Sequence, residues 1–385
     1  MTDDAHADLS GEESTRPHDR RRERAASRLD EVDAAGLVAF PSRNLQYLTG
    51  FAEEPGERHF FLVVPAASAA DPEPALLAPA LYETQVREAT SVAEIRTWSD
   101  GDDPVAATRE LLADRGLDAE RLLVDDTMWA RFTQDLRAAA PDATWGLASE
   151  ALADLRVRKD EAELAALREA AGVADAVVGD LRELGDDAVG MTEAALADRI
   201  ADRLAERGGR GVSFETVVAA GENGAKPHHG HGDREIRAGE PVVLDFGTRV
   251  DGYPSDQTRT LVFGGEPSEA YAEVHEVVRE AQAAGVEAVE PGVPASAVDR
   301  AACDVIEAAG YGDAFVHRTG HGVGLDVHEE PYLVAGNDRP LEPGMVCSVE
   351  PGIYLDGRFG CRIEDLVIVT EGGCERLNRT DRGWA

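Results

Sequence analysis

The stretch PVVLDFGTRVDGYPSDQTRT, residues 241–260, predicts a β-hairpin on which the rest of the chain is organised. Its apolar run at 242–244 is typical of a buried strand. An acid follows this run at Asp245, where burying a carboxylate is costly unless a partner offsets the loss of water. The dipeptide Asp251-Gly252 then signals a two-residue loop, and the returning arm carries a second acid, Asp256.

The register of this hairpin predicts that the two acids meet. With a loop at 251–252, Asp245 lies opposite Thr258, and Gly247 lies opposite Asp256. Because side chains alternate between the faces of a strand, Asp245 and Asp256 share one face as diagonal neighbours. We expect the glycine to leave the space between them open. The pair predicts a cation site, and the apolar run disfavours the alternative, a surface hairpin with scattered acids.

Length and composition limit the classes of protein. The 385 residues predict two domains with a sizeable core. No apolar run approaches eighteen residues, so we expect no membrane-spanning helix. The acidic, polar start lacks the pattern of a signal peptide. Without a Cys-x-x-Cys pair, we expect reduced thiols in a cytoplasmic protein. The cysteines are Cys303, Cys347, Cys361 and Cys374.

The formal net charge of −37 excludes one large class of partner. Binding to nucleic acid requires a basic face, which so acidic a chain is not expected to have. The 43% of hydrophobic residues, arranged in periodic segments, argues against disorder for most of the chain. Excess surface carboxylate is typical of proteins that work in concentrated salt, so we infer a salt-loving host.

The thermal unfolding midpoint is therefore expected to rise with salt. Repulsion at a net charge of −37 opposes the compact state. The screening length shortens from about 10 Å at 0.1 M to about 3 Å at 1 M salt, which weakens that repulsion. The measurement is thermal unfolding across a KCl series at fixed pH. A midpoint that is flat or falls with salt would contradict the inference.

The order of predicted elements indicates two domains of different kinds. Residues 1–19 lack periodicity and predict a flexible tail, followed by an amphipathic helix over 20–35. Residues 20–155 alternate strands and helices, which predicts an α/β domain without a catalytic pattern. Residues 156–385 show two helices followed by a hairpin, twice over. This repeat predicts an α+β domain built by internal duplication.

A second stretch with chemical character is HRTGHGVGLDVHEE, residues 317–330. It holds three histidines among glycines, which allow close approach of the backbone to a ligand. The glycines do not match a dinucleotide fingerprint, because no strand-turn-helix unit accompanies them. His328-Glu329 also fails the HExxH zinc pattern, since no second histidine follows.

A third stretch, residues 346–365, predicts another hairpin with an acid on each arm. The acids are Glu350 and Glu364, and Asp356-Gly357 is the loop signal. With a two-residue loop the two acids would point to opposite faces. A bulge at Pro351-Gly352 would bring them to one face, and we therefore predict a bulge there.

Together the three stretches supply four carboxylates and at least one imidazole. The acids are Asp245, Asp256, Glu350 and Glu364. This hard, oxygen-rich set favours Mn, Co or Fe over a thiolate zinc site. Because four carboxylates exceed what one ion needs, we expect two metals that share bridging carboxylates and a water.

The motifs DFG…D, HxxGHGxGxxxHE, EPG and RIED, in this order over about residues 155–380, resemble the pita-bread metallopeptidases. That group includes prolidase, aminopeptidase P and methionine aminopeptidase. The N-terminal α/β domain resembles that of the prolidase, aminopeptidase P and creatinase branch, and methionine aminopeptidases usually lack it. The resemblance implies a pita-bread catalytic domain with pseudo-two-fold duplication, preceded by a creatinase/prolidase-type domain.

The resemblance also implies the roles of particular residues. The implied metal ligands are Asp245, Asp256, His321, Glu350 and Glu364. The implied catalytic residues are His228, His328 and Glu350, and the implied substrate-binding residues are Arg362 and Tyr253. We expect two divalent ions, Mn foremost with Co, Fe or Zn as alternatives, and a homodimer.

Four residues near these motifs are expected to have no direct chemical role. His229 and His231 are predicted to be solvated loop residues, and His317 is predicted to be structural. Cys361 stands where the family often has an aliphatic residue, so a core position is expected.

The implied activity is hydrolysis of the peptide bond before proline in small peptides. The metals would lower the pKa of a shared water to about 7, Glu350 would relay a proton, and His228 and His328 would stabilise the oxyanion and the leaving imino group. We predict an Xaa-Pro dipeptidase, with Arg362 as a candidate to bind the free carboxylate of the terminal proline. The alternatives are an aminopeptidase P, metal-free creatinase-like hydrolysis and an inactive scaffold. The intact ligand set disfavours the last two.

Overall fold

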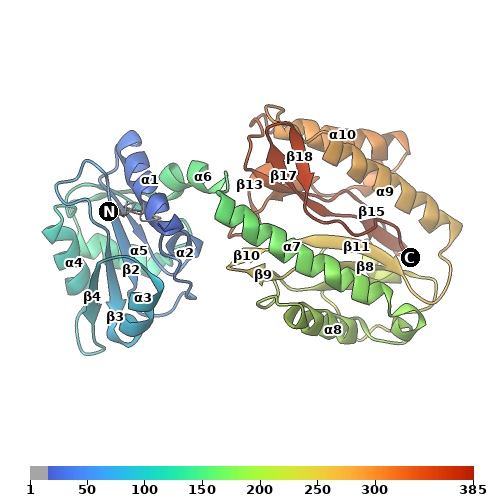
Figure 1. The fold of residues 1–385 in the computed structure, drawn as a ribbon, viewed down its shortest axis with the longest axis horizontal. Helices are drawn as coiled ribbons and strands as arrows, with labels where there is room; N and C mark the ends of the chain where they lie inside the picture. Colours follow the sequence, from blue (N-terminus) through green and yellow to red (C-terminus); the bar gives the residue numbers. More distant parts are fainter. Residues whose placement is uncertain (1–15) are drawn as a thin grey trace, which may run out of the picture. The chain divides into compact units, whose positions relative to one another are not determined.

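The computed structural model describes residues 16–385 (Figure 1). The chain divides into two compact units, the first of which ends at Leu155, while the second runs from Arg156 to Ala385. Most of the predicted tail lies outside the described residues. The first helix begins at Pro17, a residue suited to the first turn of a helix, and not at residue 20 as predicted. It ends four residues early, because Asp33 adopts a left-handed φ of 53°.

The first unit is a mixed six-stranded sheet with helices, in the order β4-β3-β2-β1-β5-β6. Its core packs helix residues against the sheet, so the predicted α/β character is confirmed. The elements are α1 (Pro17–Glu31), β1 (Gly36–Ala39), α2 (Arg43–Thr49), β2 (Phe61–Pro65), β3 (Ala75–Pro79), α3 (Glu83–Ala89), β4 (Glu94–Trp98), α4 (Pro104–Asp114), β5 (Arg121–Val124), α5 (Ala130–Ala139), β6 (Thr144–Leu147) and α6 (Ser149–Arg156).

The second unit begins with two helices and then alternates strands with a second helix pair. The elements are α7 (Glu161–Arg182), α8 (Glu193–Glu206), β7 (Val217–Ala220), β8 (Pro241–Phe246), β9 (Arg249–Val250), β10 (Tyr253–Pro254), β11 (Gln257–Val262), α9 (Glu269–Glu287), α10 (Ala295–Ala308), β12 (Gly320–Gly322), β13 (Glu329–Leu333), β14 (Val346–Val349), β15 (Gly352–Leu355), β16 (Phe359–Arg362), β17 (Asp365–Thr370) and β18 (Gly373–Arg376). None of these described helices, nor those of the first unit, has the length and apolar character needed to cross a bilayer.

The predicted duplication of the second unit is confirmed by its sheets. The strand order β11-β8-β7 in the first half matches β17-β14-β12 in the second, where β13 and β18 extend the sheet. Each half also carries a small hairpin, β9 with β10 and β15 with β16. In Figure 1, α7 and α8 accompany the first half and α9 and α10 the second.

Alternation along the strands separates a core face from a polar face. Val242 and Leu244 of β8 pack into a core with α7 and α8, so Asp245, the residue after Leu244, points to the other face. In the second half Val349 of β14 lies in the core with α9 and α10, so the next residue, Glu350, points away from it. In each half, the apolar strand residues therefore pack against helices on one face of the sheet, and the acids lie on the other face.

The first predicted hairpin has the predicted register. Val250 pairs with Tyr253, and Asp245 pairs with Thr258. The prediction that Gly247 leaves an open space between the two acids was wrong. The position that a Cβ of Gly247 would take lies 1.8 Å from the carbonyl oxygen of Ser255. The glycine is therefore required by close approach of two backbones and does not leave an open space.

The second predicted hairpin has a loop of three residues, not two. Leu355 pairs with Phe359, which leaves 356–358 as the loop. The ladders on both sides of Glu350 keep one register, so this residue lies directly opposite Glu364. The predicted bulge was therefore wrong, because the longer loop already places both acids on one face.

His275 of α9 provides a pH-dependent contribution to stability. Its side chain is buried beside Tyr271 and Trp384, and neither ring nitrogen has a hydrogen-bond partner of good geometry among the described residues. Burial lowers the pKa of His275 to about 4. Below the ordinary pKa of about 6.5 the unfolded chain binds a proton that the folded protein does not. The contribution of neutral His275 to stability is therefore fully present above about pH 6.5 and is lost as the pH falls towards 4.

We expect this residue alone to cost about 2 kcal/mol between pH 7 and pH 5. The measurement is the free energy of unfolding at both pH values for the wild type and for His275→Phe, which cannot titrate. The pH dependence of the variant should be smaller by about that amount. Equal pH dependence in the two proteins would refute the assignment.

Candidate metal centre

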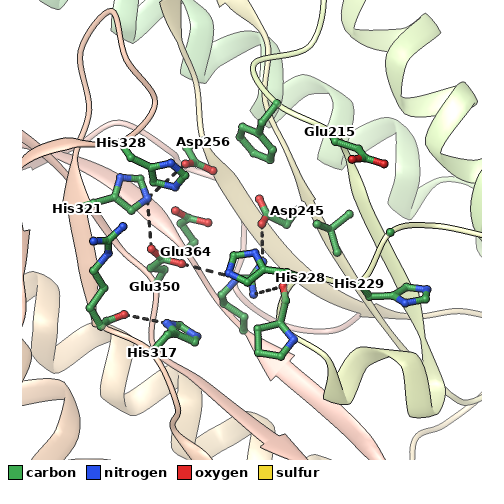
Figure 2. Close-up of a pocket in the computed structure, with 16 residues that line it drawn as sticks. Glu215, His228, His229, Asp245, Asp256, His317, His321, His328, Glu350 and Glu364 are labelled. Atoms are coloured by element: carbon green, nitrogen blue, oxygen red, sulfur yellow. Dashed lines mark hydrogen bonds and ion pairs between the residues drawn. The ribbon is translucent and has the colours of Figure 1, made fainter. Parts of the chain in front are cut away.

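The acids and histidines of the second unit line a cavity of about 330 Å³. Figure 2 shows the side chains of five of them directed towards one space, namely Asp245, Asp256, His321, Glu350 and Glu364. All of the predicted metal ligands line this cavity, as do His228, His328 and Arg362. Tyr253, the remaining predicted site residue, does not line it.

Three of the predicted ligands come from separate parts of the fold and converge most closely. Asp256 precedes β11, His321 lies on β12, and Glu364 follows β16. One ligand atom of each lies within 4.8 Å of the others, and all three side chains are buried. Asp245 and Glu350 complete the group from β8 and from the end of β14.

The orientation of the His321 ring fits a metal ligand. Nδ1 donates a hydrogen bond to the carbonyl oxygen of Gly322 at 3.1 Å, so Nε2 is the ring nitrogen that faces the cavity, where it can hold either a proton or a metal ion. Nε2 lies 3.3 Å from Oε1 of Glu350 and 3.7 Å from Oδ2 of Asp256. A lone pair that faces carboxylate oxygens is repelled unless a proton or a cation lies between them.

The carboxyl groups of the cluster have strongly perturbed proton affinities. Burial, followed by repulsion from Glu364, raises the pKa of Asp256 well above its usual value. Burial and the charge of Glu350 do the same to the pKa of Glu364. Burial also acts to raise the pKa of Glu350, but the hydrogen bond and charge of His321 and the charge of Arg362 outweigh it and lower the value to about 2. So many buried acids require a compensating positive charge.

Two oxygen atoms of the cluster are left without partners. Oδ1 of Asp245 and Oε1 of Glu364 are buried and accept no hydrogen bond from any described residue. Buried acceptors of this kind are rare, and oxygen donors are the ligands that hard divalent cations prefer. The donor set, Nε2 of His321 and the two free oxygens therefore fit divalent metal ions.

Arg362 holds the cluster in place and has few donors left for a substrate. Nη2 donates to Asp245, and Nε donates to Oγ1 of Thr258 at 3.0 Å. Thr258 donates in turn to Oε2 of Glu364 at 2.7 Å. Nη1 donates to the hydroxyl of Tyr354 at 2.8 Å. The predicted substrate role of Arg362 is not supported, because its fork is directed at the protein and its side chain is almost fully buried.

His317 and Tyr354 continue this network. Nδ1 of His317 donates to the carbonyl oxygen of Arg318 at 2.8 Å, so Nε2 accepts from the Tyr354 hydroxyl at 2.8 Å. Burial lowers the pKa of His317 and raises that of Tyr354 to about 12, so both side chains stay neutral at physiological pH. The geometry fits the structural role expected for His317.

Tyr253 stabilises the start of α7 instead of facing the cavity. Its buried hydroxyl donates to Oε1 of Glu163 at 2.9 Å. Glu163 is the third residue of the helix and forms a capping box with Asp160. The predicted substrate role of Tyr253 is therefore contradicted by its position.

His228 and His328 are the described imidazoles that are open to a bound substrate. Both are exposed and line the cavity, and their ring nitrogens make no hydrogen bond to a described residue. The His328 ring lies 4.2 Å from that of His321, centroid to centroid. Partial desolvation, followed by the charges of His321 and Arg318, lowers the pKa of His328 to about 4. His328 is thus neutral at physiological pH.

The loop that carries His228 is held by a buried acid that is not among the predicted site residues. Glu193, the first residue of α8, accepts from Nε2 of His229 at 2.9 Å and from the backbone of Ala220 at 2.8 Å. His231 is fixed as well, since its Nδ1 lies 2.8 Å from the carbonyl oxygen of Thr216. The prediction that His229 and His231 are solvated loop residues was wrong, because both rings are hydrogen-bonded within the protein.

Cys361 lies in the core, as expected. It is fully buried with Tyr271 and Ile363. Burial raises its pKa to about 12, which keeps the thiol protonated and unreactive.

Such a cluster, on a duplicated α+β unit that follows an α/β unit, is the arrangement of a metal-dependent peptidase. The chain belongs to metallopeptidase family M24, whose pattern matches residues 165–371, and residues 21–158 match the creatinase/prolidase N-terminal domain. The resemblance to the prolidase branch of the pita-bread enzymes is thereby confirmed, and this family implies divalent metal ions.

The chain is similar over nearly its whole length to proteins described as dipeptidases. It is 43% identical to the probable dipeptidase PepE of Mycobacterium bovis, over 93% of this chain and 94% of the relative. It is 37% identical to the Xaa-Pro dipeptidase of Lactobacillus helveticus, over 91% and 95% respectively. A crystal structure of recombinant prolidase from Thermococcus sibiricus superimposes with a TM-score of 0.88 at 39% identity, covering 95% of this chain and 98% of that one.

Proposed function

We propose that the protein is an Xaa-Pro dipeptidase, which hydrolyses the bond between any first residue and a C-terminal proline. The observation that carries the proposal is the convergence of four carboxylates and an imidazole in a cavity that two further, unbonded histidines line. The names of the similar proteins support the substrate class.

Two divalent ions would be held by Asp245, Asp256, His321, Glu350 and Glu364. When bound, such ions supply a water with a pKa near 7 and polarise the scissile carbonyl. Glu350 is ionised at working pH, since its pKa is about 2, and can accept a proton from water and pass it on. Mn is the ion we propose, because carboxylate and imidazole donors suit it.

His228 and His328 act on the substrate itself. His328 is neutral, so one ring nitrogen can donate a hydrogen bond to the oxygen of the scissile carbonyl as negative charge develops there. His228 is also exposed and lines the same cavity, so it can donate to the departing imino nitrogen. We also propose a homodimer, to be checked by light scattering of the purified protein.

The test compares cleavage of Leu-Pro, Leu-Pro-Pro and a longer Xaa-Pro peptide with defined metals. We expect turnover of Leu-Pro to exceed that of the longer peptides, to disappear after chelation and to return fully with Mn. If the longer peptides are cut as well as the dipeptide, the activity is that of an aminopeptidase P. If no Xaa-Pro bond is cut with Mn, Co, Fe or Zn, the proposed function is wrong.

A further inference from the structure

A dipeptidase must recognise the free carboxylate of its C-terminal residue, and the expected receptor, Arg362, is engaged by the protein. Its three nitrogen atoms donate to Asp245, Thr258 and Tyr354. A second arginine lines the same cavity. It is Arg318, which follows His317 directly in sequence.

The guanidinium of Arg318 makes no hydrogen bond or ion pair with any described residue. It is half-buried, and its Cζ atom lies 4.2 Å from the centroid of the Tyr332 ring. Stacking of this kind holds the guanidinium plane and leaves its N–H edge free to donate. An unpartnered cation in a cavity predicts an anionic group on the ligand.

The charge balance of the cavity also favours a ligand with an anionic group. Two divalent ions would carry four positive charges, which equal the four negative charges of the clustered carboxylates. Arg362 and Arg318 therefore both add positive charge to the cavity, but the donors of Arg362 are engaged by Asp245, Thr258 and Tyr354. Arg318 is then the cation on its wall whose donors are not engaged by a described residue. Figure 2 shows Glu215, an exposed acid, on the other side of the cavity from His317, the neighbour of Arg318. A dipeptide carries a carboxylate at one end and an ammonium at the other, so it matches this polarity.

We propose that Arg318 binds the C-terminal carboxylate of the substrate through a two-pronged hydrogen bond and so limits the enzyme to dipeptides. The proposal rests on the proposed Xaa-Pro dipeptidase activity. The arginine contacts the end of the substrate remote from the water that attacks. It therefore contributes to binding in the ground state and the transition state alike.

The experiment measures kcat and KM of the Mn-loaded wild type, Arg318→Ala and Arg318→Lys on Leu-Pro and on Leu-Pro amide. The amide keeps the scissile bond and lacks the carboxylate. For Arg318→Ala we expect kcat/KM on Leu-Pro to fall about 100-fold, through KM, as two charge-assisted hydrogen bonds are lost. On Leu-Pro amide, kcat/KM of Arg318→Ala should stay within about threefold of the wild-type value. Arg318→Lys should recover part of the loss on Leu-Pro, because a point charge replaces the fork.

The matched control is Arg358→Ala. Arg358 is an exposed arginine whose Cζ lies 5.2 Å from the Phe359 ring, and it does not line the cavity. Its removal should leave kcat/KM on both substrates unchanged. Equal losses on Leu-Pro and the amide in Arg318→Ala, or no loss on Leu-Pro, would overturn the assignment of Arg318 while leaving the dipeptidase activity established. If the wild type cleaves neither substrate, the proposed function fails and this proposal with it.

Discussion

Asp256→Asn is expected to lower kcat/KM by at least about a thousandfold while the fold stays nearly intact. Asp256 lies with His321 and Glu364 in the tightest group of donor atoms, and its side chain is almost completely buried. An amide has one donor oxygen and no charge, so a bound ion and its activated water should be lost. Glu350→Gln should act similarly, because it also removes the ionised proton acceptor.

The measurement is kcat/KM on Leu-Pro, with metal content determined on the same samples. Asp251→Asn is the matched control, since Asp251 is an exposed acid in the loop of the same hairpin, and asparagine tolerates its left-handed φ of 49°. This control should keep full activity and full metal content. Normal turnover by either site variant with confirmed substitution would remove Asp256 or Glu350 from the proposed centre.

Local patterns were sufficient where the chain folds back on itself over a short distance. The dipeptide at 251–252 fixed the first hairpin, and the period of two then put Asp245 on the face opposite Leu244. The loop of the second hairpin is one residue longer than predicted. Its Asp-Gly signal belongs to a three-residue loop in which Gly357 has a φ of 66°. Loop length is set by backbone geometry that a dipeptide signal does not specify.

Contacts between distant segments were not predictable from local pattern. Tyr253 lies close to the acids in the sequence, but its side chain points to α7, where Glu163 accepts a hydrogen bond from its hydroxyl. Glu193 lies 36 residues before His229 and resembled an ordinary first-turn acid. The arginine of the RIED motif was expected to face the substrate. Its actual partners come from β8 and β11 as well as its own hairpin, and no spacing in the sequence reveals that.

Arg362→Lys should weaken metal binding even though it keeps the positive charge. The arginine fork orients Asp245 directly, and it orients Glu364 through the hydroxyl of Thr258. A lysine ammonium has one nitrogen and cannot reach Asp245, Thr258 and Tyr354 together. Because groups that orient metal ligands typically contribute 10- to 100-fold to metal affinity, we expect the half-saturating Mn concentration to rise by about that factor.

Arg259→Lys is the matched control for this geometric effect. Arg259 is another buried arginine, and it pairs with Asp365 at 2.6 Å, next in sequence to Glu364. Neither Arg259 nor Asp365 lines the cavity. This control should lower the free energy of unfolding, because it disturbs a buried ion pair, but it should leave the half-saturating Mn concentration within about twofold. The two variants are compared by Mn titration of activity and by chemical unfolding. If both shift the titration equally, orientation of Asp245 and Glu364 by Arg362 is not what sets the metal affinity.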